Sequence, residues 1–191
     1  MSDESESGER EPAVSSDTSG TDGSRVERAE TDAPETDAPD PTRVVADADV
    51  LAADLLVGGV ARDALDHVRE HSWVDLVASD PLLDDCEAVV ASCADPELAA
   101  AHREKLDDVR VRVDHPEGDH PAVASAYHGD AAHLLSFDED LGSAQAGAAL
   151  RAHVDTSVKH PDAFARLFAP ERLWPEVGDG AYPGPDRDPR D

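Results

Sequence analysis

Short apolar runs alternate with longer amphipathic stretches along the middle of the chain. Runs of strand length occur at residues 43–46, 74–79, 109–113, 132–136 and 153–159. Between them, apolar positions recur every three or four residues, which is the helical period. Strands that alternate with helices predict an α/β fold, a three-layer α/β/α sandwich around a mostly parallel central sheet.

The two cysteines lie on the helix that is predicted to follow residues 74–79. Its apolar positions recur at helical spacing: Leu82, Cys86, Val89 and Cys93. Both cysteines are therefore predicted to be core residues. Because no Cys-x-x-Cys pair and no histidine at ligand spacing accompany them, the spacing does not indicate a zinc site.

Composition divides the chain into a folded middle and two polar ends. Residues 1–41 are rich in acids, Ser, Thr, Gly and Pro and hold almost no large apolar side chain. Such a segment cannot bury enough apolar area to offset its ordering entropy, so it is predicted to be a disordered acidic tail. Residues 178–191 have a similar composition and are predicted to be a second tail. The folded domain is expected at residues 42–177.

The sequence contains neither an apolar run long enough for a transmembrane helix nor a cationic, apolar leader at its start. A membrane or secretory protein is therefore not indicated, and a cytoplasmic location is expected.

Acidic residues dominate the charge of the chain. It holds 44 Asp and Glu against 16 Lys and Arg, which gives a net charge of −28. Such a surface repels itself in dilute buffer, but at about 1 M salt the Debye length falls to about 3 Å and the repulsion is screened. The composition predicts a halophilic protein of a salt-loaded cytoplasm. In so acidic a chain, a carboxylate indicates a site only through its position.

Two pairs of carboxylates follow predicted strands. Asp47 comes directly after residues 43–46, and Asp138 follows residues 132–136 after a single residue. Asp49 and Asp140 each lie two residues further on. Ligands of parallel sheets bind beyond the carboxyl ends of the strands, near a switch in strand order. If the two strands are neighbours, their oxygen ligands suit Mg²⁺ or Mn²⁺.

Further acids come from predicted helices. Asp84, Asp85 and Glu87 all follow residues 74–79, and Asp85 borders the apolar stripe that includes Leu82, so it is the preferred inward residue. Glu87 stays an alternative. Asp119 precedes Pro121 at a helix start, where its alternative role is to cap the helix.

Four segments in order resemble the PIN domain, a family of metal-dependent nucleases. They are "VVADADVLAADLL", "DLVASDPLLDDCEAVV", "GDHPAVASAYHGDAAHLLSFDEDL" and "VKHPDAFARLF". The resemblance covers residues 43–174 and is that of an acidic, haloarchaeal-type member. The chain departs from the family at Asp85, where Glu is more common, and at Asp49, where Asn or a Ser-like residue is common.

The resemblance implies an acidic site of four residues: Asp47, Asp85, Asp119 and Asp138. Asp140 would be a further metal ligand, and Ser136 and Asp49 would be auxiliary residues. Arg62, which follows Gly58 and Gly59 on an early helix, is an auxiliary candidate for contact with a phosphate.

The function that the resemblance implies is Mg²⁺- or Mn²⁺-dependent hydrolysis of RNA. The protein would act alone, as a homodimer, or as the toxin of a toxin–antitoxin pair. Two alternatives stay open. One is a non-catalytic PIN-like binding protein. The other is a haloacid-dehalogenase-like phosphatase, because "DADVL" resembles its nucleophile loop, with Asp47 as nucleophile and Asp49 as general acid.

Overall fold

Five parallel strands form one sheet in the described part of the chain, residues 38–142 and 155–190 of a computed structural model. In chain order, the strands are β1 (Asp40–Ala46), β2 (Asp75–Ser79), β3 (Val111–Val113), β4 (Ala131–Leu135) and β5 (Ser157–Lys159). They lie in the order β3-β2-β1-β4-β5, so β1 is the central strand. All four strand pairs are parallel, which confirms the α/β fold with its parallel sheet.

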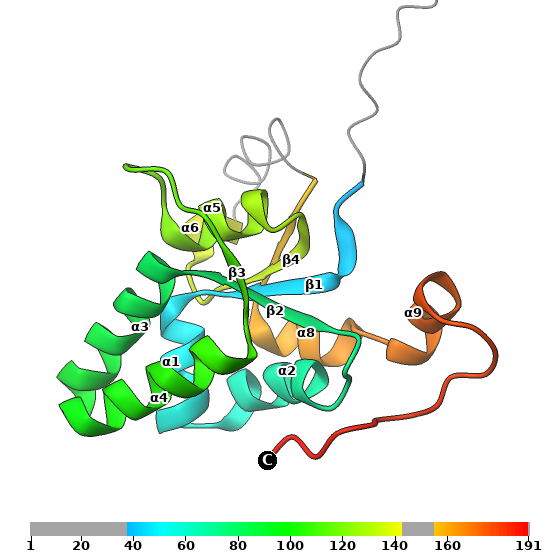
Figure 1. The fold of residues 1–191 in the computed structure, drawn as a ribbon, viewed down its shortest axis with the longest axis horizontal. Helices are drawn as coiled ribbons and strands as arrows, with labels where there is room; N and C mark the ends of the chain where they lie inside the picture. Colours follow the sequence, from blue (N-terminus) through cyan, green and yellow to red (C-terminus); the bar gives the residue numbers. More distant parts are fainter. Residues whose placement is uncertain (1–37, 143–154, 191) are drawn as a thin grey trace, which may run out of the picture. The chain divides into compact units, whose positions relative to one another are not determined.

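Helices connect the strands and cover both faces of the sheet (Figure 1). They are α1 (Ala48–Leu56), α2 (Gly59–Arg69), α3 (Asp80–Cys93), α4 (Pro96–Val109), α5 (Pro121–His128), α6 (Glu139–Gly142), α8 (Pro161–Leu167) and α9 (Pro170–Val177). Helices α1 to α4 and α8 pack in a layer on one face, and α5 contacts β1, β2 and β4 from the other. The three-layer arrangement is confirmed.

The strand order explains which helix lies on which face. The chain runs from β1 through β2 to β3 in one direction across the sheet and then returns past β2 and β1 to β4. Because parallel crossovers are right-handed, connections that run in opposite directions place their helices on opposite faces. α5, on the returning connection, is therefore separated from α1 to α4.

The core lies on both sides of the central strands. Val44, Val45 and Ala46 of β1 and Leu134 and Leu135 of β4 are fully buried. Strands covered on both faces have continuous apolar runs instead of alternating ones. This explains why the apolar runs in the sequence located the strands.

The predicted strands at residues 43–46, 74–79, 109–113 and 132–136 are all present, and each end lies within three residues of its predicted position. The fifth occupies Ser157–Lys159, while residues 153–154 lie outside the described part. The predicted break at Gly58 and Gly59 is also present. Both residues have positive φ angles, 73° and 58°, which glycine adopts without strain.

The ends of the domain differ from the expected boundaries. The expected acidic tail, up to residue 37, lies outside the described residues, and β1 already begins at Asp40. Residues 178–190 contain no helix or strand, but they contact the end of α2. The Asp186 N–H donates to the Glu70 carbonyl at 2.9 Å, and the Tyr182 hydroxyl hydrogen-bonds to His71. The folded part therefore extends past residue 177.

None of the helices in the described ranges is both long enough and apolar enough to cross a membrane.

Candidate functional site

The carboxyl ends of β1 and β4 lie side by side at the centre of the sheet. Ala46 is in register with Leu135, and the Asp47 N–H donates to the Leu135 carbonyl at 2.9 Å. From here the chain leaves β1 toward β2 and leaves β4 toward β5, in opposite directions across the sheet. This is a topological switch point, where α/β sheets bind ligands. The two acid-terminated strands are thus neighbours, as the metal-site hypothesis requires.

Asp47 is held by both of its carboxylate oxygens. Oδ1 accepts a hydrogen bond of 2.8 Å from the Ala48 N–H, which caps α1. Oδ2 accepts a hydrogen bond of 3.0 Å from the Ser136 hydroxyl. A half-buried carboxylate with both oxygens bonded has a fixed orientation, and here it lies at the edge of the sheet beyond β1.

Ser136 connects Asp47 to Asp138. Its side chain is buried, donates to Asp47, and accepts a hydrogen bond of 3.0 Å from the Asp138 N–H. The Asp138 carboxylate is exposed and accepts at 2.7 Å from the Asp140 N–H. One hydroxyl therefore bonds to the Asp47 carboxylate after β1 and to the Asp138 backbone after β4.

Asp49 has the most unusual environment of the predicted site residues. One of its carboxylate oxygens, Oδ1, is buried and has no hydrogen-bond partner. Burial raises the pKa of Asp49, and the charges of Asp47 and, more weakly, Asp138 raise it further. Three carboxylates consequently lie within electrostatic range of one another at the switch point. The sequence indicated only an auxiliary role for Asp49.

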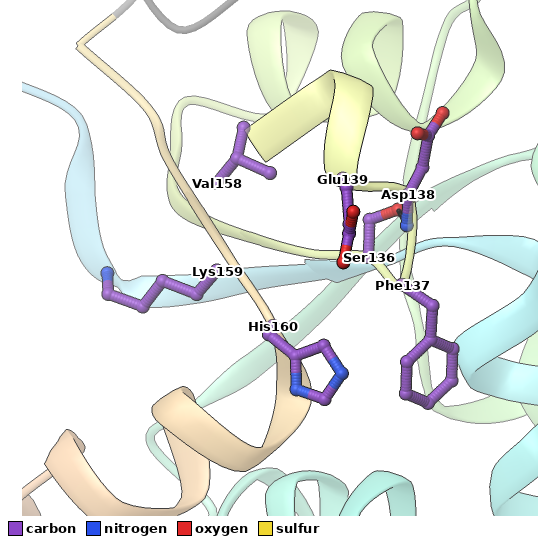
Figure 2. Close-up of a pocket in the computed structure, with 7 residues that line it drawn as sticks. All are labelled: Ser136, Phe137, Asp138, Glu139, Val158, Lys159 and His160. Carbon is purple, nitrogen blue, oxygen red and sulfur yellow. Dashed lines mark hydrogen bonds between the residues drawn. The ribbon is translucent and has the colours of Figure 1, made fainter. Parts of the chain in front are cut away.

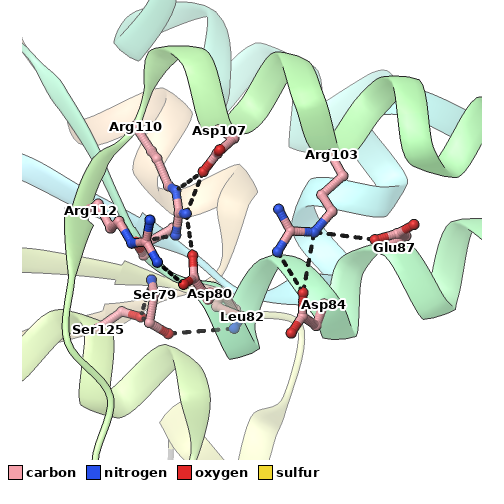
Figure 3. Close-up of polar contacts among 11 residues, drawn as sticks. Ser79, Asp80, Leu82, Asp84, Glu87, Arg103, Asp107, Arg110, Arg112 and Ser125 are labelled. Carbon is pink, nitrogen blue, oxygen red and sulfur yellow. Dashed lines mark hydrogen bonds and ion pairs between the residues drawn. The ribbon is translucent and has the colours of Figure 1, made fainter.

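Arg103 of α4 distinguishes among the three candidate acids of α3 (Figure 3). Its guanidinium pairs with Asp84 at 2.6 Å and with Glu87 at 3.2 Å. Asp85 makes no ion pair within the described residues, but it is exposed instead of bordering the core. No hydrogen bond in the described part joins Asp85 to Asp47, Asp49 or Asp138.

Asp119 is exposed in the turn before α5. Because α5 leads back into β4, its first residues lie on the side of the sheet where β4 ends. The structure gives the capping position to His120, which makes no side-chain capping bond. Asp119 therefore does not serve as the helix cap, and no hydrogen bond in the described residues joins it to the other predicted acids.

Asp140 and Arg62 contribute less than predicted. The Asp140 side chain is exposed, and only its backbone N–H takes part, as a donor to Asp138. Arg62 pairs with the buried Asp54 at 3.3 Å and also donates to the Asp54 carbonyl. Asp54 lies near the end of α1, away from the switch point where α1 begins. Arg62 is thus engaged in holding α2 to α1.

Two arginines at the edge of the sheet are also engaged (Figure 3). Arg110 is buried and bonds to the Ala78 carbonyl at 2.8 Å and to Asp107 and Asp80. Arg112 is exposed and pairs with Asp80. The two guanidinium groups lower the pKa of Asp80 through hydrogen bonds and charge. This cluster holds β3 to the start of α3.

A shallow pocket adjoins the carboxylates (Figure 2). It has a volume of about 290 Å³ and is lined by residues 136–139 and 158–160. Phe137 and His160 form one side, with their ring centroids 5.2 Å apart. Of the three carboxylates at the switch point, Asp138 lines this pocket. The pocket gives a ligand space beside the switch point.

The oxygens at the switch point fit a hard divalent cation. Across residues 38–142 and 155–190, no three His, Cys, Asp or Glu side chains form a group that could hold a metal ion by themselves. Mg²⁺, however, is commonly bound through one or two carboxylates and keeps several waters. Asp47, Asp49 and Asp138 supply only hard oxygens, and the buried Asp49 Oδ1 has no hydrogen-bond partner in the described residues.

The sequence-based prediction missed Lys159 and His133. Lys159 Nζ lies 3.0 Å from His133 Nδ1 on the strand beside it. Burial and the neighbouring Lys159 lower the pKa of His133 to about 4, so the imidazole is neutral. Lys159 was one of only two lysines in the sequence, and that rarity was the available signal.

Residues 38–190 match the model of a family of unknown function (DUF7384). No curated protein and no solved structure matches the chain.

Proposed function

The chain belongs to DUF7384, a family of unknown function, and we propose that it is a cytoplasmic, metal-dependent ribonuclease of PIN type. The substrate would be RNA and the cofactor Mg²⁺ or Mn²⁺. The order of four sequence motifs supports the proposal, and so does the α/β/α fold with acids at its switch point.

The observation that carries the proposal is the electrostatic state of Asp49. Its buried oxygen has no hydrogen-bond partner, and two other carboxylates oppose its ionisation. In a protein that needed these side chains only for solubility, they would lie apart in water. A cation held by one or two of these carboxylates, with waters completing its coordination, would offset their repulsion.

In the proposed mechanism, one or two of the carboxylates of Asp47, Asp49 and Asp138 would hold the ion, and water would complete its coordination. Ser136 keeps the Asp47 carboxylate oriented, and Asp49 would contact the ion in its ionised form. The bound ion would lower the pKa of an attacking water and stabilise charge on the phosphate oxygens. The pocket at residues 136–139 and 158–160 leaves space for the RNA strand beside Asp138.

Cleavage of RNA tests the proposal. We expect the full chain to cleave RNA in molar KCl when Mn²⁺ or Mg²⁺ is present, and chelator to abolish cleavage. Asp47→Asn and Asp138→Asn should each lower kcat by roughly a hundredfold or more, because an amide lacks the charge that holds the ion. Binding of Mn²⁺, measured by calorimetry, should weaken in both variants.

Asp84→Asn is the matched control. Asp84 is an exposed acid on α3, and Arg103 would keep its second partner, Glu87. This variant should cleave like the parent. If Asp47→Asn and Asp138→Asn also cleave like the parent, the proposed site is wrong. If the parent binds Mn²⁺ but cleaves no RNA, a non-catalytic binding protein replaces the proposal.

A phosphatase is the second candidate, and the raised pKa of Asp49 favours it. In that reaction Asp47 would attack phosphorus, and Asp49, protonated more readily than an ordinary aspartate, would donate a proton to the leaving oxygen. Lys159 is the lysine nearest to the site in the described chain, but its side chain points away from Asp138 (Figure 2). Hydrolysis of p-nitrophenyl phosphate, with RNA left intact, would identify this activity instead.

A further inference from the structure

A second pocket, which shares Lys159 with the first, lies between the sheet and the last two helices. It has a volume of about 340 Å³, which lies within the range of small-molecule sites in proteins. Its lining comes from the start of β1, from β4 and β5, and from α8 and α9.

Lys159 and His133 form the polar part of this pocket. The Lys159 side chain extends away from Asp138 and Glu139 (Figure 2), and its ammonium group lies 3.0 Å from His133 Nδ1. Phe164 and Phe168 contact the His133 ring edge to face, with centroids 5.4 and 6.0 Å away. The imidazole is neutral, so it can accept a hydrogen bond from Lys159 but cannot balance its charge.

Lys159 is exceptional among the cations of this acidic protein. Most arginines in the described residues pair with a carboxylate: Arg43, Arg62, Arg69, Arg103, Arg110, Arg112 and Arg166. Lys159 is half-buried and has no carboxylate within ion-pair distance in this part of the chain. Its burial lowers its pKa. A charge taken from water without a partner costs free energy, and an anion in the pocket would offset that cost.

The rest of the pocket is mainly apolar. Phe164, Phe168 and Leu173 line it, and Leu167, which is 73% exposed, lies at its opening. Arg172 adds a second exposed cation to the lining, and Glu176, one turn further on α9, is its only acid. The pocket thus combines apolar walls with a net positive charge, in a chain whose net charge is −28.

We propose that this pocket binds a small organic carboxylate with an apolar body. The carboxylate would pair with Lys159, and its aryl or alkyl body would lie against Phe164 and Phe168. The inference goes beyond the proposed ribonuclease function and does not depend on it, because none of the three site carboxylates lines this pocket.

The two lysines of the chain allow a direct test with phenylacetate as the probe. Lys159 and the exposed Lys105 of α4 would be acetylated with limiting acetic anhydride in molar KCl and quantified by peptide mass spectrometry. Phenylacetate at about ten times its Kd should slow acetylation of Lys159 about tenfold by mass action, and that of Lys105 not at all. Phenylacetamide, which has the same shape but no charge, should protect neither.

The outcomes separate the proposal from its competitors. If phenylacetamide protects Lys159 as well as phenylacetate does, the pocket recognises apolar shape alone. If phenylacetate gives no protection up to 50 mM, the pocket binds no such anion. Either result overturns the proposal. Phenylacetate should also raise the Tm of the parent and of Lys105→Met, but not that of Lys159→Met. Because the labelling uses the native chain, the test stands even if Lys159→Met does not fold.

Discussion

Asp49 combines two unfavourable effects on one side chain. Burial removes water from its carboxylate, and the charges of Asp47 and Asp138 oppose its ionisation. Its pKa is therefore raised, so the folded state binds a proton more tightly than the unfolded state does. By linkage, the ionised Asp49 lowers the stability of the metal-free protein at neutral pH.

Asp49→Asn should consequently stabilise the protein in the absence of metal. The gain should be complete above the raised pKa, shrink as the pH falls through it, and vanish below about 3.9, the ordinary value for aspartate. Urea unfolding in chelator at a series of pH values measures this. Asp84→Asn, which loses an exposed ion pair instead, should not be stabilised. A gain of equal size at every pH would exclude ionisation as the cause.

The two cysteines occupy different environments, although their spacing predicted two core residues. Cys86 is buried, and burial raises the pKa of its thiol to about 12, whereas Cys93 is exposed. The prediction for Cys93 was wrong: it is the last residue of α3 and lies outside the buried set of that helix.

A thiol-specific reagent should therefore distinguish the two residues. Since the thiolate is the reactive form, Ellman's reagent should modify one thiol in the native chain and two in guanidinium chloride. Cys93→Ser should abolish the native reaction, and Cys86→Ser should leave it unchanged. Rapid modification of both thiols without denaturant would contradict the buried position of Cys86.

At the scale of elements, the phase of α3 explains why Asp85 was misplaced. The sequence suggested a buried stripe at Leu82, Cys86, Val89 and Cys93, but the buried residues are Leu82, Leu83, Cys86 and Val90. At about 100° per residue, including Leu83 and Val90 rotates the centre of the stripe away from Asp85. Periodicity identified the helix, but its rotation depends on how α1 and α4 pack against it, which the periodicity of α3 does not contain.

The pairing of α1 with α2 depends on a buried acid that the sequence did not reveal. Asp54 is 4% exposed and pairs with Arg62 and Arg69 of α2. Both arginines are partly exposed, so solvent screens part of the attraction.

Asp54→Asn should lower the free energy of unfolding by about 1–2 kcal/mol, because two arginines would lose a charged acceptor. The exposed Asp63 on α2 is the matched control, and Asp63→Asn should change stability by less than about 0.5 kcal/mol. Urea unfolding at constant KCl measures both. Equal effects of the two substitutions would show that the buried pair contributes nothing specific.

At the scale of the whole molecule, the fold was predictable because its signals are local. Apolar runs located the five strands, and their alternation with helices indicated the layers. The sequence could predict that Asp47 and Ser136 lie close together only if their two strands are neighbours, because their distance depends on the strand order. The state of Asp49 and the positions of Asp85 and Arg62 depend on distances between elements, which no local pattern in the sequence encodes.

The C-terminal segment shows the same limit. Its composition predicted a tail, yet one aromatic residue connects it to the domain. Tyr182 hydrogen-bonds to the buried His71 and stacks on its ring at a centroid distance of 5.9 Å. Nearby, the Ser72 N–H donates to the Asp186 carboxylate at 2.7 Å.

Tyr182→Phe should lower the free energy of unfolding by about 1 kcal/mol, since it removes one hydrogen bond to a buried imidazole. Tyr127→Phe is the control, because Tyr127 is 54% exposed and makes no side-chain hydrogen bond in the described part. Thermal unfolding in high salt measures both variants. If Tyr182→Phe leaves the Tm unchanged, the hydrogen bond between Tyr182 and His71 does not contribute to stability.

The position of β1 between β2 and β4 also determines when the site forms during synthesis. Asp47 and Ser136, which hydrogen-bond to each other, are separated by 89 residues in the chain. At a translation rate of roughly 5–20 residues per second, Asp47 leaves the ribosome some 4–18 s before its partner does. Throughout that interval one edge of β1 has no neighbouring strand. The nascent chain must therefore protect the open edge of its central strand well before any carboxylate site exists.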